Sequence, residues 1–396
     1  MTEKLFEDLQ AIYPEMVEFR REMHMNPELS FQEVHTPKKI ANYLRDLGLE
    51  VRTEVGGRGV VGKLQGEKPG KTIAFRADFD ALPIQDQKNV DYKSTVDGAM
   101  HACGHDIHTA SLLGAAKVLS QHKDKISGSI VFIHQFAEEQ IPGGAISMIE
   151  DGCLDGVDEI YGAHVWTSIP LGTIGIIGDY AMAAGDQFDI EIIGKGGHGA
   201  KPHVTVDSIY IASQVLNQLH QIVGRQVDPL KTGVITVGKI NGGQAFNIIA
   251  ENTNMSGTVR TFDAEVRDTI EEKIKQVTTA VCEGLGGTAN ISYTRGYPAL
   301  YNHPEPLKNV DDLAQNVVGK PHVKYLLPSP GMEDFAYYVK EVPGAFFFIG
   351  GANEEINAVY PNHHPKFDVD ERCMLNAAKM FISLALQEKQ GADDER

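Results

Sequence analysis

The hydrophobic pattern of residues 1–180 alternates between helix-like and strand-like segments. Apolar positions spaced three and four residues apart predict an amphipathic helix over 6–25. Short apolar runs between turn residues predict buried strands at 59–64, 71–76, 129–134 and 159–165. A helix is expected to begin at Asp106, whose side chain is typical of an N-cap. This alternation predicts an α/β domain with a largely parallel or mixed sheet.

The pattern changes after residue 185. Strands are predicted at 188–193, 233–240, 248–260 and 289–294, with helices at 207–222 and 264–285. This β-α-β-β-α-β order resembles a ferredoxin-like unit. Beyond residue 300 the first pattern resumes, with a strand at 345–349 and a final helix at 370–387. We therefore predict a discontinuous α/β domain, formed by 1–185 and 299–396, with an α+β ferredoxin-like domain inserted at 186–298.

Composition narrows the class of protein. A chain of 396 residues suits roughly two domains. The net charge of −18, without a cluster of Lys and Arg, argues against a nucleic-acid partner. No apolar run approaches the ~20 residues that span a bilayer. Four widely spaced cysteines and an acidic N-terminus without signal-peptide character predict a cytoplasmic protein.

The segment 101–108 contains the most distinctive chemistry. It holds three imidazoles, a thiol and a carboxylate, from His101, Cys103, His105, Asp106 and His108. Imidazole and thiolate suit zinc and related transition metals. A Cys-x-His pair is too short to complete a four-coordinate site, so other ligands must come from distant segments.

Several polar residues follow predicted strands, and ligands of open α/β sheets bind beyond the carboxyl ends of strands. Asp78 and Asp80 follow one strand, and His164 closes another. Glu138 and Glu139 follow a third, where one carboxylate could hold a metal while its neighbour accepts a proton from water. The pair His363-His364 lies in a Pro-bounded loop, and adjacent side chains point differently, so only one is expected to be a ligand.

The segment Gly194–Gly199 formally matches G-x-G-x-x-G, which raises the alternative of a dinucleotide-dependent oxidoreductase. That motif should open a helix, whereas Pro202 disfavours helix here and the next helix is predicted near Asp207. We interpret the glycines as a flexible loop that presents His198. In the same region, Arg260 is either salt-bridged at the surface or a bidentate partner for a substrate carboxylate.

Five motifs occur in order, and together the chain resembles the M20 metallopeptidase family over nearly its whole length. The motifs are Arg76-Ala77-Asp78-Phe79-Asp80-Ala81-Leu82-Pro83, His101-Ala102-Cys103-Gly104-His105-Asp106, Gln135-Phe136-Ala137-Glu138-Glu139, the His198 loop and His363-x-Pro-x-Phe. The resemblance is strongest to the amidohydrolase branch, which includes hippurate hydrolases, N-acyl-amino-acid amidohydrolases and indoleacetyl-amino-acid hydrolases. Relatives often have Ser or Gly where Met332 stands, so one pocket wall is expected to differ.

The resemblance implies a role for each matched residue. It implies two divalent metal ions, with Mn or Zn preferred and Co or Ni also suited. The implied ligands are Cys103, His105, Glu139, His164 and His363. Glu138 matches the general base, and Asn247 and Arg260 match the pair that anchors substrate. His198 matches a lid histidine that, in dimeric relatives, reaches the partner's active site. His101 and His108 are expected to orient ligands instead of binding metal.

The resemblance thus implies hydrolysis of the amide bond of N-acyl amino acids or related small conjugates. Metal-activated water would attack, with Glu138 as the base, in a homodimer assembled through the lid domain. A dipeptidase or aminopeptidase of the same family is the alternative within enzymes. A metal-binding protein without catalysis is the alternative outside them, although binding alone would not need Glu138.

Overall fold

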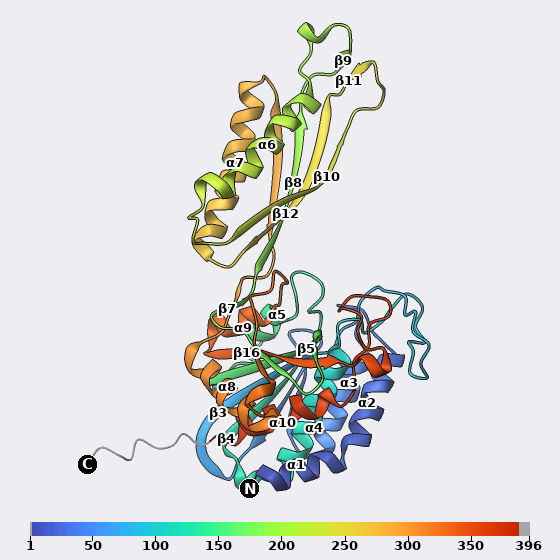
Figure 1. Ribbon diagram of the computed structural model, residues 1–396, viewed down its shortest axis with the longest axis vertical. Coiled ribbons are helices and arrows are strands. Elements are labelled where there is room, and N and C mark those ends of the chain that lie inside the picture. The colour runs from blue at the N-terminus through green and yellow to red at the C-terminus, as the bar shows by residue number, and fades with distance from the viewer. Residues whose placement is uncertain (1, 388–396) are drawn as a thin grey trace, which may run out of the picture. The chain divides into compact units, whose positions relative to one another are not determined.

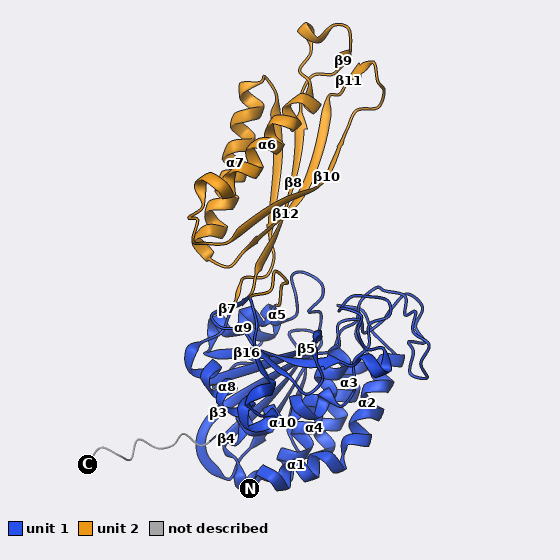
Figure 2. Cartoon of the chain, in the orientation of Figure 1, with its two compact units in different colours: residues 1–181, 301–327, 334–396 blue, residues 182–300, 328–333 orange. Residues whose placement is uncertain are grey.

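The computed structural model describes residues 2–387, which form two compact units (Figures 1 and 2). Unit 1 comprises residues 1–181, 301–327 and 334–396, and unit 2 comprises 182–300 and 328–333. Unit 1 is therefore built from three separate stretches of chain. Residues 328–333 belong to unit 2, which the hydrophobic pattern did not predict. The last nine positions of the expected segment 299–396 lie outside the described residues.

Unit 1 contains an eight-stranded mixed sheet in the order β1-β2-β4-β3-β5-β16-β6-β15. The strands are β1 (Glu50–Val55), β2 (Gly59–Gln65), β3 (Lys68–Asp78), β4 (Ser127–Gln135), β5 (Glu159–Pro170), β6 (Ile174–Ile176), β15 (Val323–Tyr325) and β16 (Gly344–Ala352). The four central strands β4, β3, β5 and β16 are parallel neighbours. Their carboxyl ends therefore meet at one edge of the sheet, where α/β folds bind ligands.

Helices cover this sheet. They are α1 (Thr2–Ala11), α2 (Tyr13–Met25), α3 (Thr36–Asp46), α4 (His105–Ser120), α5 (Ala145–Glu150), α8 (Pro304–Val318), α9 (Phe335–Glu341) and α10 (Cys373–Ala385). Helix α4 is buried on almost every side and packs against α2, α10 and β3. A helix that is apolar all round has to lie inside a protein. Its first residue, His105, is consequently held deep in unit 1.

Two helix boundaries differ from the predicted ones. The helix expected over 6–25 is two helices, α1 and α2, with Pro14 in the first turn of α2. Proline lacks the N–H that would continue the hydrogen-bond ladder of the preceding helix. Asp106 is not the N-cap of α4, because that position is Gly104. Its side chain is instead completely buried and lies 2.8 Å from Arg20 Nε.

Unit 2 has a four-stranded antiparallel sheet in the order β10-β12-β8-β13. Its main elements follow the chain as β8 (Ala184–Ile193), α6 (Ser208–Gln226), β10 (Gly233–Gly242), β12 (Asn252–Thr261), α7 (Ala264–Gly284) and β13 (Thr288–Arg295). Both helices lie on the same face of the sheet (Figure 1). The alternation of β8 explains this, because Phe188, Ile190 and Ile192 enter the helix-covered core.

The strand expected over 248–260 is divided into β11 (Ile248–Ile249) and β12. Strand β11 pairs with β9 (Gly197–His198) to form a small ribbon that is separate from the main sheet. No helix among residues 2–387 is both long and apolar enough to cross a membrane.

A buried ionic network ties α2 to α4 and to the segment that precedes α10. Arg20, which has no exposed surface, contacts Asp106 at 2.8 Å and both Asp368 and Glu371 at 3.3 Å. Burial alone would raise the pKa of Asp106, but the charges of Arg20 and His24 hold it well below its ordinary value. The carboxylate therefore stays ionised next to the metal-ligand motif.

Arg20→Met should strongly destabilise unit 1, because it leaves the buried negative charge of Asp106 without its positively charged partner. We expect a loss of ~3–5 kcal/mol in the free energy of unfolding at neutral pH. The lowered pKa of Asp106 means that its stabilising contribution is full above pH 3.8 and is lost as the pH falls below that value. The difference between wild type and variant should therefore shrink on acidification. Urea unfolding can be followed through Trp166, the one tryptophan of the chain.

Arg21→Met is the matched control. Arg21 also pairs with Glu371, but its side chain is 42% exposed, so the substitution should cost less than ~1 kcal/mol. Equal losses in the two variants would contradict the importance of burial.

Candidate metal centre and active site

The expected metal ligands lie together at the carboxyl edge of the unit 1 sheet. His164 belongs to β5, and Glu139 lies in the loop that follows β4. Cys103 precedes α4, His105 begins it, and His363 comes from the loop before α10. Four separate stretches of the chain thus meet at one place.

Cys103 lies at the centre of this cluster. Its Sγ is 3.3 Å from His164 Nε2 and 3.2 Å from His363 Nε2. Glu139 Oε1 lies 3.3 Å from His363 Nε2 and 3.7 Å from His105 Nε2. These donor atoms form two overlapping groups of metal-ligand spacing, one on Cys103, His105 and His164 and the other on Cys103, Glu139 and His363.

The position between Cys103 and His105 requires glycine. Gly104 has a φ of 95°, which places it in the left-handed region. A Cβ atom at this position would lie 2.4 Å from Val165 Cγ1. The tight turn brings both Cys103 and His105 to the same side, and a larger residue would separate them.

Hydrogen bonds to the second ring nitrogen orient the histidines. His164 Nδ1 donates to the Val165 carbonyl oxygen at 2.9 Å, and His105 Nδ1 donates to Asp80 Oδ1 at 3.0 Å. Both rings therefore direct an Nε2 lone pair into the cluster. His105 Nε2 is buried and has no hydrogen-bond partner among the described residues.

His108 and His101 do not direct a ring nitrogen into the cluster in the way that His164 and His105 do. His108 Nδ1 donates to Asp78 at 2.6 Å, and its Nε2 accepts the Val165 N–H at 2.9 Å, so both nitrogens are occupied. His101 is buried against the His24 ring, and burial lowers its pKa to about 4. Neither nitrogen of His101 has a hydrogen-bond partner within residues 2–387.

The acidic side chains around the cluster favour the binding of cations. Burial lowers the pKa of His105, but Asp78 and Asp80 outweigh it and raise that pKa to about 10. Burial, and then the charge of Glu139, raise the pKa of the Cys103 thiol well above its ordinary value. An ionised thiolate here would need a bound cation beside it. His105 Nε2, which is buried and lacks a hydrogen-bond partner among residues 2–387, fits the same requirement. The donor set therefore suits divalent transition metals.

The structure distinguishes the two adjacent histidines of the last loop. His363, at a φ of 67°, faces Cys103 and Glu139. The His364 ring stacks on Tyr360 at a centroid distance of 4.6 Å, and its Nδ1 accepts the Lys366 N–H. His364 is therefore turned away from the cluster.

Glu138 lies beside Glu139 and is only 7% exposed. Its carboxylate lies at metal-ligand spacing from the Glu139 carboxylate and from a ring nitrogen of His105. Glu138 thus lies next to the metal cluster and is shielded from bulk water, as a base that acts on a bound water molecule would have to be.

The other expected site residues, His198, Asn247 and Arg260, belong to unit 2. They do not all lie close to one another. His198 pairs with Ile248 in the β9–β11 ribbon, and the Asn247 carbonyl accepts the Gly199 N–H at 2.8 Å. Arg260 lies near the other end of β12. Arg260 is eight steps along the extended strand from Asn252, about 26 Å at a rise of ~3.3 Å per residue. His198 and Asn247 are therefore neighbours, whereas Arg260 of the same subunit is far from both.

The glycine loop also lacks the setting of a dinucleotide site. The chain continues from Gly194 into β9, and α6 begins only at Ser208, after the N-cap Asp207. Asp207 accepts the N–H groups of Ile209 and Tyr210, as expected of an N-cap. The phosphate-binding helix terminus that the motif requires is absent from this segment.

Asp78 and Asp80 make contacts around the cluster that the sequence pattern did not identify. Asp78 joins His108 to the buried Arg76, which also pairs with Asp334 at 2.7 Å. Asp80 orients His105 and accepts the Glu139 N–H at 3.0 Å. Their position at the end of a buried strand was the available signal, but it did not specify which partners they would hold.

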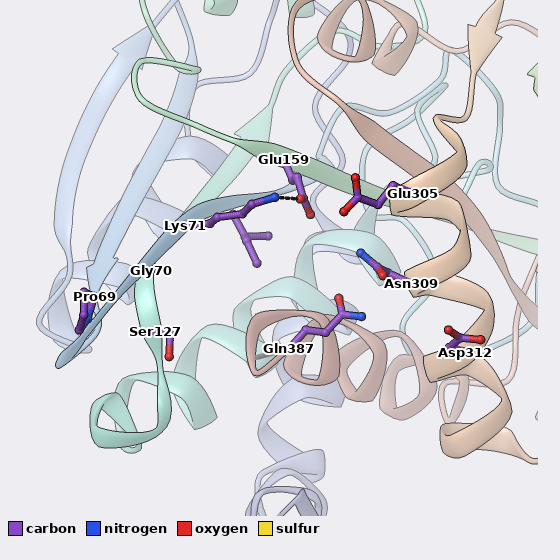
Figure 3. Close-up of a pocket in the computed structure, with 10 residues that line it drawn as sticks. Pro69, Gly70, Lys71, Ser127, Glu159, Glu305, Asn309, Asp312 and Gln387 are labelled. Carbon is purple, nitrogen blue, oxygen red and sulfur yellow. Dashed lines mark hydrogen bonds and ion pairs between the residues drawn. The ribbon is translucent and has the colours of Figure 1, made fainter. Parts of the chain in front are cut away.

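A cleft of about 910 Å³ lies elsewhere in unit 1, where β3 and β5 begin (Figure 3). Lys71 and Glu159 form an ion pair in it, and Glu305 and Asn309 come from α8. None of the expected site residues lines this cleft. It lies toward the amino ends of the strands, opposite the edge that carries the metal-ligand cluster.

Comparison with known proteins identifies the family. Residues 74–387 match Peptidase family M20/M25/M40. The chain belongs to this family. It is therefore a hydrolase of amide bonds, and its α/β fold is that of M20 peptidases.

Three similar proteins illustrate the relationship. YhaA of Bacillus subtilis (strain 168) is 48% identical over 386 residues, 98% of each chain. N-acyl-L-amino acid amidohydrolase of Geobacillus stearothermophilus is 43% identical over 291 residues, 74% of this chain and 79% of that protein. The crystal structure of Bacillus subtilis YXEP, a dinuclear metal-binding peptidase, is 35% identical with a TM-score of 0.83, covering 95% of this chain and 98% of that one.

Cobalt reconstitution should reveal the thiolate ligand. We expect Co²⁺ to give the wild-type protein a thiolate-to-metal charge-transfer band that Cys103→Ser lacks. Absorbance titration measures it directly, without an activity assay. Cys153→Ser is the control, because Cys153 is buried in unit 1 next to Arg52 and Asp155 and outside the cluster. An unchanged band in Cys103→Ser would contradict the assignment.

Proposed function

We propose that this enzyme hydrolyses the amide bond of N-acyl amino acids or related small conjugates. The observation that carries the proposal is the pair Glu138-Glu139, buried and half-buried respectively, against the cluster of Cys103, His105, His164 and His363. The Glu139 carboxylate lies among the proposed metal ligands, and the Glu138 carboxylate lies beside them. Similarity to an N-acyl-L-amino acid amidohydrolase supports the substrate class.

Two divalent ions, Mn or Zn in preference to Co or Ni, would be held by Cys103, His105, Glu139, His164 and His363. When bound, they lower the pKa of the attacking water and polarise the substrate carbonyl. Similarity to a dinuclear metal-binding peptidase supports the number of ions. Four buried, unpaired cysteines, far apart in sequence, support a reducing and therefore cytoplasmic location.

The protein groups then divide the work of amide hydrolysis. Glu138 accepts a proton from the attacking water and delivers it to the nitrogen of the leaving amine. His198 donates a hydrogen bond to the carbonyl oxygen as negative charge develops there. Arg260 and Asn247 hold the carboxylate of the amino-acid portion, where the planar guanidinium can bind two oxygens at once.

We propose that unit 2 is a ferredoxin-like lid through which two subunits associate. Large apolar side chains are exposed near its β9–β11 ribbon. They are Val204, Ile209, Tyr210, Ile240, Phe246 and Ile248. Exposed apolar patches of this kind favour protein contacts. The separation of Arg260 from His198 and Asn247 supports a shared site, in which one subunit provides Arg260 and the other provides His198 and Asn247.

The substrate class can be tested with metal-reconstituted enzyme and a panel of N-acetyl amino acids, N-aroyl amino acids and dipeptides. We expect amine release from the N-acyl compounds, and a fall in kcat of about 10²–10⁴-fold in Glu138→Gln with metal content unchanged. Turnover of dipeptides with none of N-acyl compounds would overturn the proposal in favour of a dipeptidase. Loss of metal from Glu138→Gln would overturn the division of roles between Glu138 and Glu139.

The shared site can be tested by mixing two inactive variants, His198→Ala and Glu138→Ala, under conditions that exchange subunits. A mixed dimer contains one site with both wild-type groups, so random exchange should restore about one quarter of wild-type activity. Each variant exchanged with itself is the control. If His198 serves its own subunit, no activity returns in the mixture.

A further inference from the structure

The loop that carries Glu138 has an unusual backbone conformation. Ala137 has a φ of 51° and no exposed surface. Residues other than glycine rarely adopt this left-handed conformation, because Cβ then crowds the following carbonyl oxygen. The conformation persists only where neighbouring groups hold it. At this position it determines the direction in which Glu138 leaves the backbone.

One side chain holds that backbone. Glu33 Oε1 accepts the Ala137 N–H at 2.9 Å, and Glu33 is only 1% exposed. Its other oxygen, Oε2, is buried without a hydrogen-bond partner among the described residues, and Arg58 Nε lies 3.8 Å away. A buried carboxyl group with an unsatisfied oxygen is costly to stability. The hydrogen bond from the Ala137 N–H offsets part of this cost.

A second contact fixes the same loop on the other side of Glu138. Asp80 Oδ2 accepts the Glu139 N–H at 3.0 Å. The segment that bears Glu33 adds an aromatic contact, because the Phe31 and Phe136 rings meet edge to face at 5.8 Å. Glu138 is thus the residue between two backbone N–H groups, each held by a different buried carboxyl group.

We propose that Glu33 is a positioning residue, whose hydrogen bond to the Ala137 N–H holds the left-handed turn that aims Glu138 at its substrate water. This inference rests on the proposed role of Glu138 as the base. The metal ligand Glu139 is held separately by Asp80, so loss of the Glu33 contact should disturb the base without removing metal.

Two substitutions test separately whether the position of the Glu33 acceptor oxygen or the charge of Glu33 affects kcat. Glu33→Gln keeps an oxygen at the same distance but removes the charge, and should retain kcat close to that of wild type. Glu33→Asp keeps the charge but withdraws the acceptor by one methylene. It should lower kcat by about 10- to 100-fold, with KM and metal content unchanged, since small displacements of a reacting group cost this much.

Glycine at position 137 provides an independent signature. It adopts a φ of 51° without steric cost, so Ala137→Gly should restore part of kcat when combined with Glu33→Asp. Glu28→Ala is the matched control, because Glu28 lies in the same segment and accepts the N–H groups of Val34, His35 and Thr36. It should lower the Tm and leave kcat unchanged.

The outcomes distinguish this inference from the proposed function. If Glu138→Gln is inactive but Glu33→Asp turns over like wild type, the positioning role is wrong and the base assignment stands. If Glu138→Gln is active, the base assignment itself fails. Equal losses of kcat in Glu33→Gln and Glu33→Asp, or no recovery with Ala137→Gly, would show that Glu33 acts through charge or folding and would overturn the inference.

Discussion

The site depends on a single buried carboxylate. Asp80 accepts hydrogen bonds from the Ser30 hydroxyl at 2.7 Å and from the Glu139 N–H, and it orients His105 through Nδ1. It is 1% exposed, so water does not compete for these contacts. One side chain at the end of β3 thereby fixes the positions of α4, of the loop after β4 and of the segment after α2. The metal ligands could not converge if these three segments moved independently.

Much of this arrangement follows from local sequence. Strand patterns and the spacing of Cys103 and His105 indicated an α/β sheet with metal ligands at its carboxyl edge. The rest depends on contacts between distant residues. Asp106 has the side chain of an N-cap, yet the charge of Arg20, far away in sequence, draws it into the core. Residue preferences do not predict the left-handed turn at Ala137 either, since its contact with the buried Glu33 joins residues far apart in sequence.

Unit 2 shows a different limit of sequence reasoning. The resemblance implied that Asn247 and Arg260 act as a pair and that His198 reaches a partner's site, but it did not give the distances among these residues. His198 and Asn247 meet through the β9–β11 ribbon, whereas Arg260 lies at the far end of a long strand. Because β12 is extended, Arg260 lies about 26 Å from Asn252, which is farther than a small substrate reaches. The proposal that two subunits share a site therefore rests on a distance, which no sequence motif contains.

The order of the ligands along the chain also has a consequence for biosynthesis. Cys103 and His363 are 260 residues apart, and all of unit 2 lies between them in the sequence. Domains fold as units while the ribosome extends the chain from its N-terminus. Unit 2 can therefore fold while the metal cluster still lacks its last ligand. A chain that ends before residue 363 lacks one of the proposed metal ligands, so we expect activity only after that residue has been added.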